Sequence, residues 1–321
     1  MEIRPILSTL RRHRLTATLL MLQVAFTCAI VCNVAFMIAN RIHQSSLPTG
    51  ITENALSSIS SVGIRKSENP LAQHEVDLAA LRAIPGVESA VAVSNSLPLN
   101  HSDHSEGVCP DLQTLMNAIH NQALGRHCAQ ASMYDGTSGL IKTLGLRLVE
   151  GRDFRPDEFA KSESTTPSVA IISRAFAEAL YPGQNALGKT MFADPEKGTR
   201  IVGVVDALLR PYLRKPGQNY YSMIFPNLPD DYSVTYVLRS APQDRRRVLD
   251  AARAALLKVD PNRIVDPKHM QTYSQIRAQY FQRDTTMIGL LIASALGLLF
   301  VTALGITGLA NFWVGQRTRS I

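Results

Sequence analysis

Residues 183–190 read GQNALGKT, which matches the phosphate-binding pattern G-x4-G-K-[ST] letter for letter. In nucleotide-binding proteins such a loop follows a strand and leads into a helix, whose N-terminus faces the phosphates. Here a helical pattern over residues 175–180 precedes the loop, and a proline follows it closely at Pro195. We therefore regard the match as misleading and expect no cofactor to bind at Gly183, Gly188, Lys189 and Thr190.

A second group of residues with suitable chemistry lies between residues 101 and 128. Its potential metal ligands include His101, Asp103, His104, Cys109, His120, His127 and Cys128. Their spacing lacks the paired short steps of zinc sites, so we expect a solvated loop and no metal. Cys109 and Cys128 are the only cysteines outside the first apolar stretch, and an oxidising compartment would allow them to form one disulfide.

The sequence lacks common enzymatic motifs. The chain contains neither HExxH nor GxSxG, and no Ser, His and acidic residue are spaced to indicate a catalytic triad. The sequence therefore predicts no catalytic residue and no enzymatic activity of its own.

Two long apolar stretches flank the segment that contains these residues. No charged residue occurs from Leu15 to Asn40 or from Thr285 to Gln316. The hydrocarbon core of a bilayer is about 30 Å thick and needs about 20 apolar helical residues. The sequence therefore predicts transmembrane helices over residues 15–40 and 285–314. The first stretch is too long for a signal peptide and lacks a clean cleavage site, so we expect a retained anchor.

Charge indicates the orientation of these helices. The net charge is +7, and basic residues are concentrated at the two chain ends. In residues 41–283 the numbers of basic and acidic residues are nearly equal. Basic residues that flank membrane spans mark the cytoplasmic side. The prediction is an inner-membrane protein with cytoplasmic ends, residues 1–14 and 315–321, and a periplasmic segment over residues 41–283. The basic character then reflects topology, and we expect no nucleic-acid binding.

The periplasmic segment predicts an α+β domain. Two strand–helix–strand patterns resemble one another in length, one before and one after a long insertion at about 97–205. The predicted strands and helices of the two patterns cover residues 59–64, 74–84, 87–93, 234–239, 244–259 and 264–266. Residues 270–284 predict a stalk helix that enters the second span without a break and carries rigid-body motion across the membrane surface.

Small residues recur in the second span. Gly289, Ala293 and Gly297 are spaced four apart, which places them on one helix face. Small side chains allow close approach of helices in lipid, so these residues predict a helix-packing face.

Several phrases of the domain resemble the MacB-type periplasmic core domain. They are IPGVES (84–89), LGLRLVEGRDF (144–154), VAIISRAFA (169–177), LYPGQNALGK (180–189) and IVGVVD (201–206). The last residues, QRTRSI (316–321), resemble the start of the FtsX-like permease region. Because the P-loop-like phrase belongs to this family pattern, the resemblance also explains the misleading match.

This resemblance implies the permease subunit of an ABC transporter of the mechanotransmission type, in which a partner hydrolyses ATP and a periplasmic domain moves. The domain would have a porter-like part that is split by an inserted part. The implied partners are a cytoplasmic ABC ATPase subunit, a second permease (as a homodimer or a pair), a periplasmic adaptor and membrane lipid. Family members continue beyond the point where this chain stops, so we expect an N-terminal portion with the rest of the permease missing.

Two alternatives stay open at this stage. A two-span sensor with a periplasmic ligand-binding domain would need a cytoplasmic output domain. A membrane-anchored hydrolase would need a catalytic constellation. The sequence does not indicate what the transporter would move.

Overall fold

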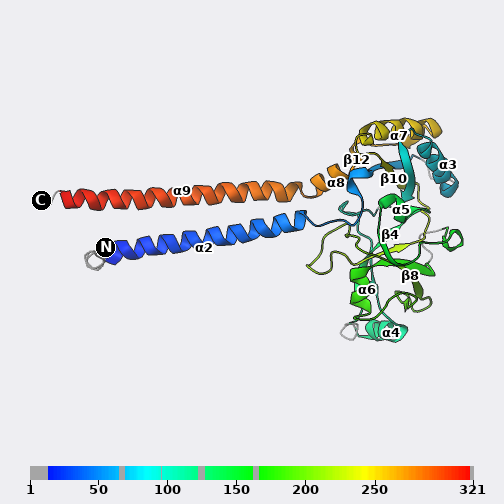
Figure 1. Cartoon of the computed structure of the whole chain (residues 1–321), viewed down its shortest axis with the longest axis horizontal. Helices are drawn as coiled ribbons and strands as arrows, with labels where there is room; N and C mark the ends of the chain where they lie inside the picture. Colours follow the sequence, from blue (N-terminus) through cyan, green and yellow to red (C-terminus); the bar gives the residue numbers. More distant parts are fainter. Residues whose placement is uncertain (1–13, 65–68, 95, 122–126, 162–165, 319–321) are drawn as a thin grey trace. The chain divides into compact units, whose positions relative to one another are not determined.

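The computed structural model describes residues 14–64, 69–94, 96–121, 127–161 and 166–318. The chain forms two compact units (Figure 1). The two chain ends, up to Leu47 and from Phe281, form a helical unit, and Pro48–Tyr280 form an α+β unit. The predicted fold class, in which two apolar helices flank an α+β domain, is confirmed. Residues 1–13 and 319–321 of the predicted cytoplasmic ends lie outside the described residues.

The helical unit consists of α2 (Arg14–Ser45) and α9 (Gln282–Thr318). Both helices contain a segment long and apolar enough to cross a membrane, Thr18–Ser45 in α2 and Gln282–Gly308 in α9. Apolar side chains cover their outer surfaces, and Phe36 is 72% exposed. Water would disfavour such a surface, whereas lipid accommodates it.

The first sheet of the α+β unit has the strand order β11-β1-β10-β2, and β12 also pairs with β1. Because β10 lies between β1 and β2 and runs antiparallel to both, the two predicted strand–helix–strand patterns interlock. The elements are β1 (Leu56–Gly63), α3 (Pro70–Arg82), β2 (Val87–Val93), β10 (Ser233–Ser240), α7 (Arg245–Val259), β11 (Arg263–Ile264), the 3-10 turn η4 (Pro267–His269) and β12 (Met270–Thr272).

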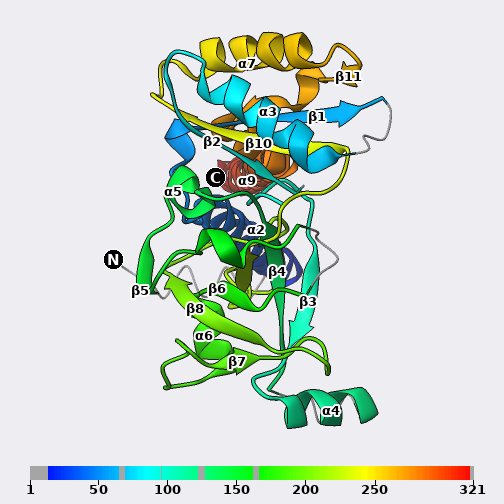
Figure 2. The same cartoon turned by 90° about the vertical axis from the view of Figure 1, so that its right-hand side faces the viewer.

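The second sheet has the order β3-β4-β9-β6-β8-β5, with β7 beside β8 (Figure 2). The predicted end of the inserted subdomain at residue 205 is too early, because β9 also belongs to this sheet. That strand is a short, fully buried apolar run without alternation, which gives little sequence signal. The elements are β3 (Ser105–Val108), α4 (Leu112–His120), β4 (Ala129–Asp135), α5 (Leu140–Leu144), β5 (Leu148–Gly151), η3 (Pro156–Glu158), β6 (Val169–Ser173), α6 (Arg174–Leu180), β7 (Thr190–Met191), β8 (Thr199–Val205) and β9 (Ser222–Phe225).

Strand alternation divides the interior into three cores. In β2, Ala90 and Ala92 pack with α3 and α7, whereas Val91 and Val93 face the opposite way. In β6 of the second sheet, Ala170 packs with α6 and Ile171 faces the opposite way. The opposite-facing residues of both sheets meet in one shared core, so the two sheets are joined by a continuous apolar layer.

A short helix, α8 (Tyr273–Tyr280), follows β12. The predicted unbroken helix over 270–284 is therefore wrong at two points. Met270–Thr272 pair with β1 as a strand, and Phe281 interrupts the helix before α9 begins. The side-chain carbonyl of Gln275 accepts a 2.9 Å hydrogen bond from the Thr272 amide, as in a capping box, and this sets the start of α8.

Candidate functional site

Within the α+β unit, an ion pair binds the helix α8 to η1 (Glu53–Ala55). The Arg277 guanidinium donates to both carboxylate oxygens of Glu53, at 2.8 and 2.6 Å. Each side chain is 23% exposed. Burial alone would raise the pKa of Glu53, but hydrogen bonds from Arg277 and Thr49 and the charge of Arg277 lower it. The pair is therefore ionised at neutral pH and shielded from much of the solvent.

Aromatic residues provide further anchors of α8. Tyr273 is fully buried in the core shared by the two sheets, and its hydroxyl donates to the carbonyl of Pro98. At the other end of the helix, the Tyr280 hydroxyl accepts a 2.9 Å hydrogen bond from the amide of Leu213. The ring of Tyr280 stacks on His101 with ring centroids 4.3 Å apart. The helix that precedes α9 in sequence thus contacts both the first sheet and the inserted subdomain.

The segment that leaves β2 is fixed in an unusual conformation beside α8. Leu99 and His101 have positive φ angles of 64° and 65°, which a bulky residue adopts only when its surroundings hold it there. Their amides donate to the carbonyls of Arg210 and Pro211, at 3.4 and 3.2 Å. These contacts tie the first sheet to the segment between β8 and β9.

A buried polar network stabilises the first sheet and its helices. The Asp77 carboxylate on α3 accepts two hydrogen bonds from Arg263 on β11, at 2.7 and 3.0 Å, and one from the Tyr236 hydroxyl, at 2.6 Å. The side chains of Asp77 and Arg263 are 2% and 3% exposed. His74 lies beside this network, where burial lowers its pKa. It donates from Nε2 to the carbonyl of Asp231 at 2.9 Å.

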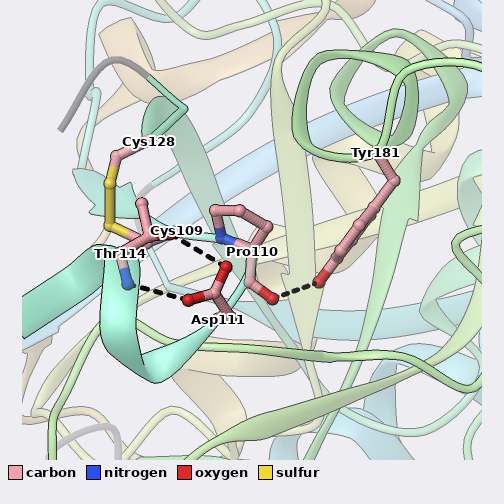
Figure 3. Close-up of a disulfide and its surroundings, with 6 residues drawn as sticks. All are labelled: Cys109, Pro110, Asp111, Thr114, Cys128 and Tyr181. Atoms are coloured by element: carbon pink, nitrogen blue, oxygen red, sulfur yellow. Dashed lines mark hydrogen bonds between the residues drawn. A yellow bond between two sulfur atoms is a disulfide. The ribbon is translucent and has the colours of Figure 1, made fainter.

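The P-loop-like phrase has the opposite order of elements from a phosphate site. It follows α6 and leads into the strand β7, so the loop does not open a helix as a phosphate-binding loop does. The Lys189 ammonium lies 4.4 Å from the ring centroid of Tyr181, which is a cation–π contact. The Tyr181 hydroxyl lies 3.1 Å from the carbonyl oxygen of Pro110 (Figure 3). It lies at the same distance from the carbonyl oxygen of Thr190. Burial is the larger cause and the negative charge of Asp111 is the smaller one, and together they raise the pKa of Tyr181 to about 12. Lys189 therefore contributes to the packing of this loop through its contact with Tyr181.

Cys109 and Cys128 form a disulfide with an S–S distance of 2.00 Å (Figure 3). The register of the two strands explains this pairing, because Val108 opposite Ala129 is the last pair of β3 and β4 and the two cysteines come next. The bond closes a segment that contains α4. Asp111 caps this helix by accepting from the amide of Thr114 at 2.7 Å. Residues 122–126 of the segment lie outside the described residues.

The other potential metal ligands of this segment do not converge. His101 stacks on Tyr280, Asp103 pairs with Arg210 and Arg214, and the His120 imidazole bonds the carbonyl of Met116. In the described parts of the chain, no three His, Cys, Asp or Glu side chains are arranged to hold a metal ion.

The contact between α2 and α9 uses a face of α9 other than that of Gly289, Ala293 and Gly297. Gly289, Ala293 and Gly297 are exposed and do not face α2. Instead, buried and partly buried residues of α9 follow alternating steps of four and three, as in a coiled-coil seam, and Met287 is one further partly buried residue. The residues at these steps are Asp284, Ile288, Leu291, Ala295, Leu298, Thr302 and Gly305.

Polar contacts mark this seam along its length. The hydroxyls of Thr27 and Thr302 are 3.0 Å apart, and the Gln23 side chain occupies the space that a Cβ would need at Gly305. At one end, Arg41 pairs with Asp284. Sequence spacing missed this seam because its positions hold residues of mixed size and polarity. The exposed face with Gly289 stays a prediction for packing against some other helix.

Residues 15–263 match the family model of the MacB-like periplasmic core domain. Because this match spans more than half of the chain, the chain belongs to that family. Membership indicates a permease component of an ABC transporter, a class whose members are generally non-catalytic. Among proteins with curated descriptions, no sequence matches this chain.

Solved structures show similar domains at low identity. The extracellular domain of the noncanonic ABC-type transporter YknZ from Gram-positive bacteria is 18% identical, with a TM-score of 0.41, and the alignment covers 65% of this chain and 99% of that one. The periplasmic region of MacB from Actinobacillus actinomycetemcomitans is 12% identical, with a TM-score of 0.41 and coverage of 72% and 94%. A domain of a putative permease from Porphyromonas gingivalis is 15% identical, with a TM-score of 0.37 and coverage of 68% and 83%. The family assignment rests on the family model alone.

Proposed function

We propose that this chain transmits ATP-driven motion from a cytoplasmic ABC ATPase to its α+β unit, as a mechanotransmission permease that serves export. The anchoring of α8 is the observation that carries this proposal. Through Arg277 and Tyr273, α8 is bound both to η1 and to the core between the two sheets. A displacement of α8 would therefore move both subdomains together, since packed cores resist continuous deformation.

The composition of the two long helices supports a mechanical role in place of a conducting one. Charged and strongly polar groups mark the paths of ions and polar substrates through membranes. Residues 15–40 and 285–316 contain no charged side chain. The α2–α9 seam includes the hydroxyls of Thr27 and Thr302, which are 3.0 Å apart and occupied with one another and with helix carbonyls. We therefore assign contact with the exported substrate to the α+β unit.

The proposed orientation places both termini in the cytoplasm and Pro48–Tyr280 in the periplasm, with α2 and α9 in the inner membrane. The basic residues at the two chain ends, in residues 1–14 and 317–319, support this orientation by the positive-inside rule. The disulfide of Cys109 and Cys128 supports it independently, since structural disulfides persist in oxidising compartments.

The proposed partners follow from the division of labour in such a transporter. ATP hydrolysis is assigned to a separate ATPase, and Lys189 is engaged with Tyr181 in this chain. A second permease, identical or paired, would pack against the exposed face of Gly289, Ala293 and Gly297. A periplasmic adaptor would bind the α+β unit, and lipid would surround α2 and α9.

The experiment is a detergent pull-down of the natural gene product with mass spectrometry and an ATPase assay. We expect a stoichiometric P-loop ATPase in the eluate, with turnover abolished when the Walker lysine of that partner is replaced. Lys189→Ala in this chain is the matched control and is expected to leave turnover unchanged. Repeated absence of an ATPase, or loss of turnover in Lys189→Ala, would contradict the proposal.

A further inference from the structure

A cavity of about 530 Å³ lies between the first sheet and α8, within the α+β unit. Its walls are β1, β10, the segment after β2, the turn η4 with β12, and α8. Leu97 and Ile276 of its lining also belong to the core shared by the two sheets, so the cavity borders that core. Ligand pockets of proteins are typically about 300–1,000 Å³, and this space is therefore sufficient for a small organic molecule.

The floor of the cavity is a group of hydroxyls on the first sheet. Side chains alternate along a strand, so Ser58 and Ser60 lie on the same face of β1 as Leu56, which packs in the shared core. Thr235 on β10 is opposite Ser60, and their hydroxyl oxygens are 2.9 Å apart. Hydroxyl groups thus take the place of the apolar side chains that this face of the sheet carries elsewhere.

Ser58 supplies an unpaired hydroxyl to this floor. The residue is only 6% exposed, and its Oγ atom has no hydrogen-bond partner in the described part of the chain. The Oγ atom of Ser57, on the other face of β1, is fully enclosed, whereas that of Ser58 keeps accessible surface and opens into the cavity. The Ser58 hydroxyl can therefore donate a hydrogen bond to a ligand or accept one.

The charged group in the lining is positive. Lys268 on η4 is exposed at the edge of the cavity, and its ammonium group pairs with no carboxylate among the described residues. No aspartate or glutamate of the described chain lines the cavity. Asp266, two positions before Lys268, lies outside the lining and contacts His269 at 3.5 Å. An anion in the cavity would therefore meet an unpaired ammonium group and no opposing carboxylate.

The walls above this floor are fixed in place. Leu99 and His101, both with positive φ angles, line the cavity, and the ring of His101 stacks on Tyr280 of α8. The Gln271 side chain on β12 donates a 2.6 Å hydrogen bond to the Gln279 side chain on α8, and both residues are in the lining. Strained backbone of this kind is frequent at ligand sites. The cavity is thus preformed.

We propose that this cavity binds a small hydroxylated organic acid, whose carboxylate pairs with Lys268 and whose hydroxyl groups bond to the floor at Ser58. The hydroxyls and amides of the lining match the hydroxyl groups of such a ligand, and Lys268 matches its charge. The inference goes beyond the transporter role and does not depend on it, because binding can be measured without an ATPase.

The test uses the full chain in nanodiscs of zwitterionic lipid, with empty nanodiscs subtracted. Isothermal titration at pH 7 compares D-glucuronate with two probes that keep its ring. D-Glucose has a hydroxymethyl group in place of the carboxylate, and tetrahydropyran-2-carboxylate lacks the hydroxyl groups. We expect glucuronate to bind at least about tenfold more tightly than either probe. No detectable binding of glucuronate, or equal affinity for glucuronate and one of the other two probes, would overturn the proposal.

Variants locate the binding to this cavity. Lys268→Met is expected to weaken glucuronate binding about tenfold, and Ser58→Ala about fivefold. Lys258→Met, at an exposed position of α7 outside the lining, and Ser57→Ala, on the other face of β1, are the matched controls and should bind as the wild type does. Thermal unfolding curves check that all four variants fold. Wild-type affinity in the double variant Lys268→Met/Ser58→Ala would overturn the assignment.

Discussion

Asp77→Ala is expected to lower the free energy of unfolding of the α+β unit by about 4 kcal/mol. The substitution leaves the Arg263 guanidinium buried and without its bidentate partner, and it also removes the acceptor of the Tyr236 hydroxyl. For a unit of this size the melting temperature should fall by about 10 °C. Thermal unfolding of the purified full chain in detergent, followed by near-ultraviolet circular dichroism, measures this shift.

A double variant distinguishes two causes of the destabilisation, namely loss of the Asp77–Arg263 attraction and burial of an unpaired Arg263 charge. Asp77→Leu combined with Arg263→Met replaces both ions by apolar groups of similar volume, and most of the stability should return. Asp244→Ala is the control, because Asp244 and Arg247 form an exposed pair on α7 and such pairs contribute under about 1 kcal/mol. A shift below about 2 °C in Asp77→Ala would show that the network does not stabilise the unit.

Removing the disulfide is expected to produce the second largest effect. Cys109 and Cys128 are separated by 19 positions, and a loop of this length corresponds to roughly 3 kcal/mol of chain entropy in the unfolded state. Cys109→Ser should therefore lower the melting temperature by about 6–12 °C and expose α4 to proteolysis. Adding a reductant to the wild type should reproduce both changes.

The free cysteines provide the control for this experiment. Cys28 and Cys32 are free thiols that lie exposed on α2. The double variant Cys28→Ser/Cys32→Ser should melt as the wild type does and keep its full response to reductant. A wild-type melting temperature in Cys109→Ser would contradict a structural role for the bond.

The sequence predicted those elements whose pattern is local and strong. The strands β2 and β10 and the helix α7 have regular apolar patterns with clear boundaries, and the structure has them within one residue of the predicted bounds. By contrast, the prediction missed α4, although Leu112, Leu115, Met116 and Ile119 recur at the three- and four-residue steps of one helix face. The start of α8 had a usable local signal that the prediction missed, namely the capping-box pattern of Thr272 and Gln275.

The contacts that matter for function could not be predicted, because they join distant parts of the chain. Glu53 and Arg277 are 224 positions apart, and nothing near either residue indicates its partner. Local periodicity reports which face of an element is buried, whereas these contacts depend on which elements the tertiary fold brings together.

Transfer of motion through α8 depends on how strongly this helix is bound to η1. The Glu53–Arg277 pair must hold α8 firmly enough that motion reaches the sheets before the helix detaches. Hydrogen bonds to charged groups contribute about 1.5–3 kcal/mol, so Arg277→Ala should increase hydrogen exchange in α8 by about tenfold or more. Arg247→Ala, on the exposed surface of α7, should leave this exchange unchanged.

Transfer of motion through α8 can be measured by hydrogen exchange with mass spectrometry on the complex with its ATPase, compared between the nucleotide-free and ATP-bound states. We expect ATP to change protection in peptides that cover Tyr273–Tyr280 and Glu53–Ala55, and Arg277→Ala to abolish the change at η1 while ATP hydrolysis continues. An ATPase that binds and hydrolyses ATP in the complex with no change in these peptides would contradict this expectation.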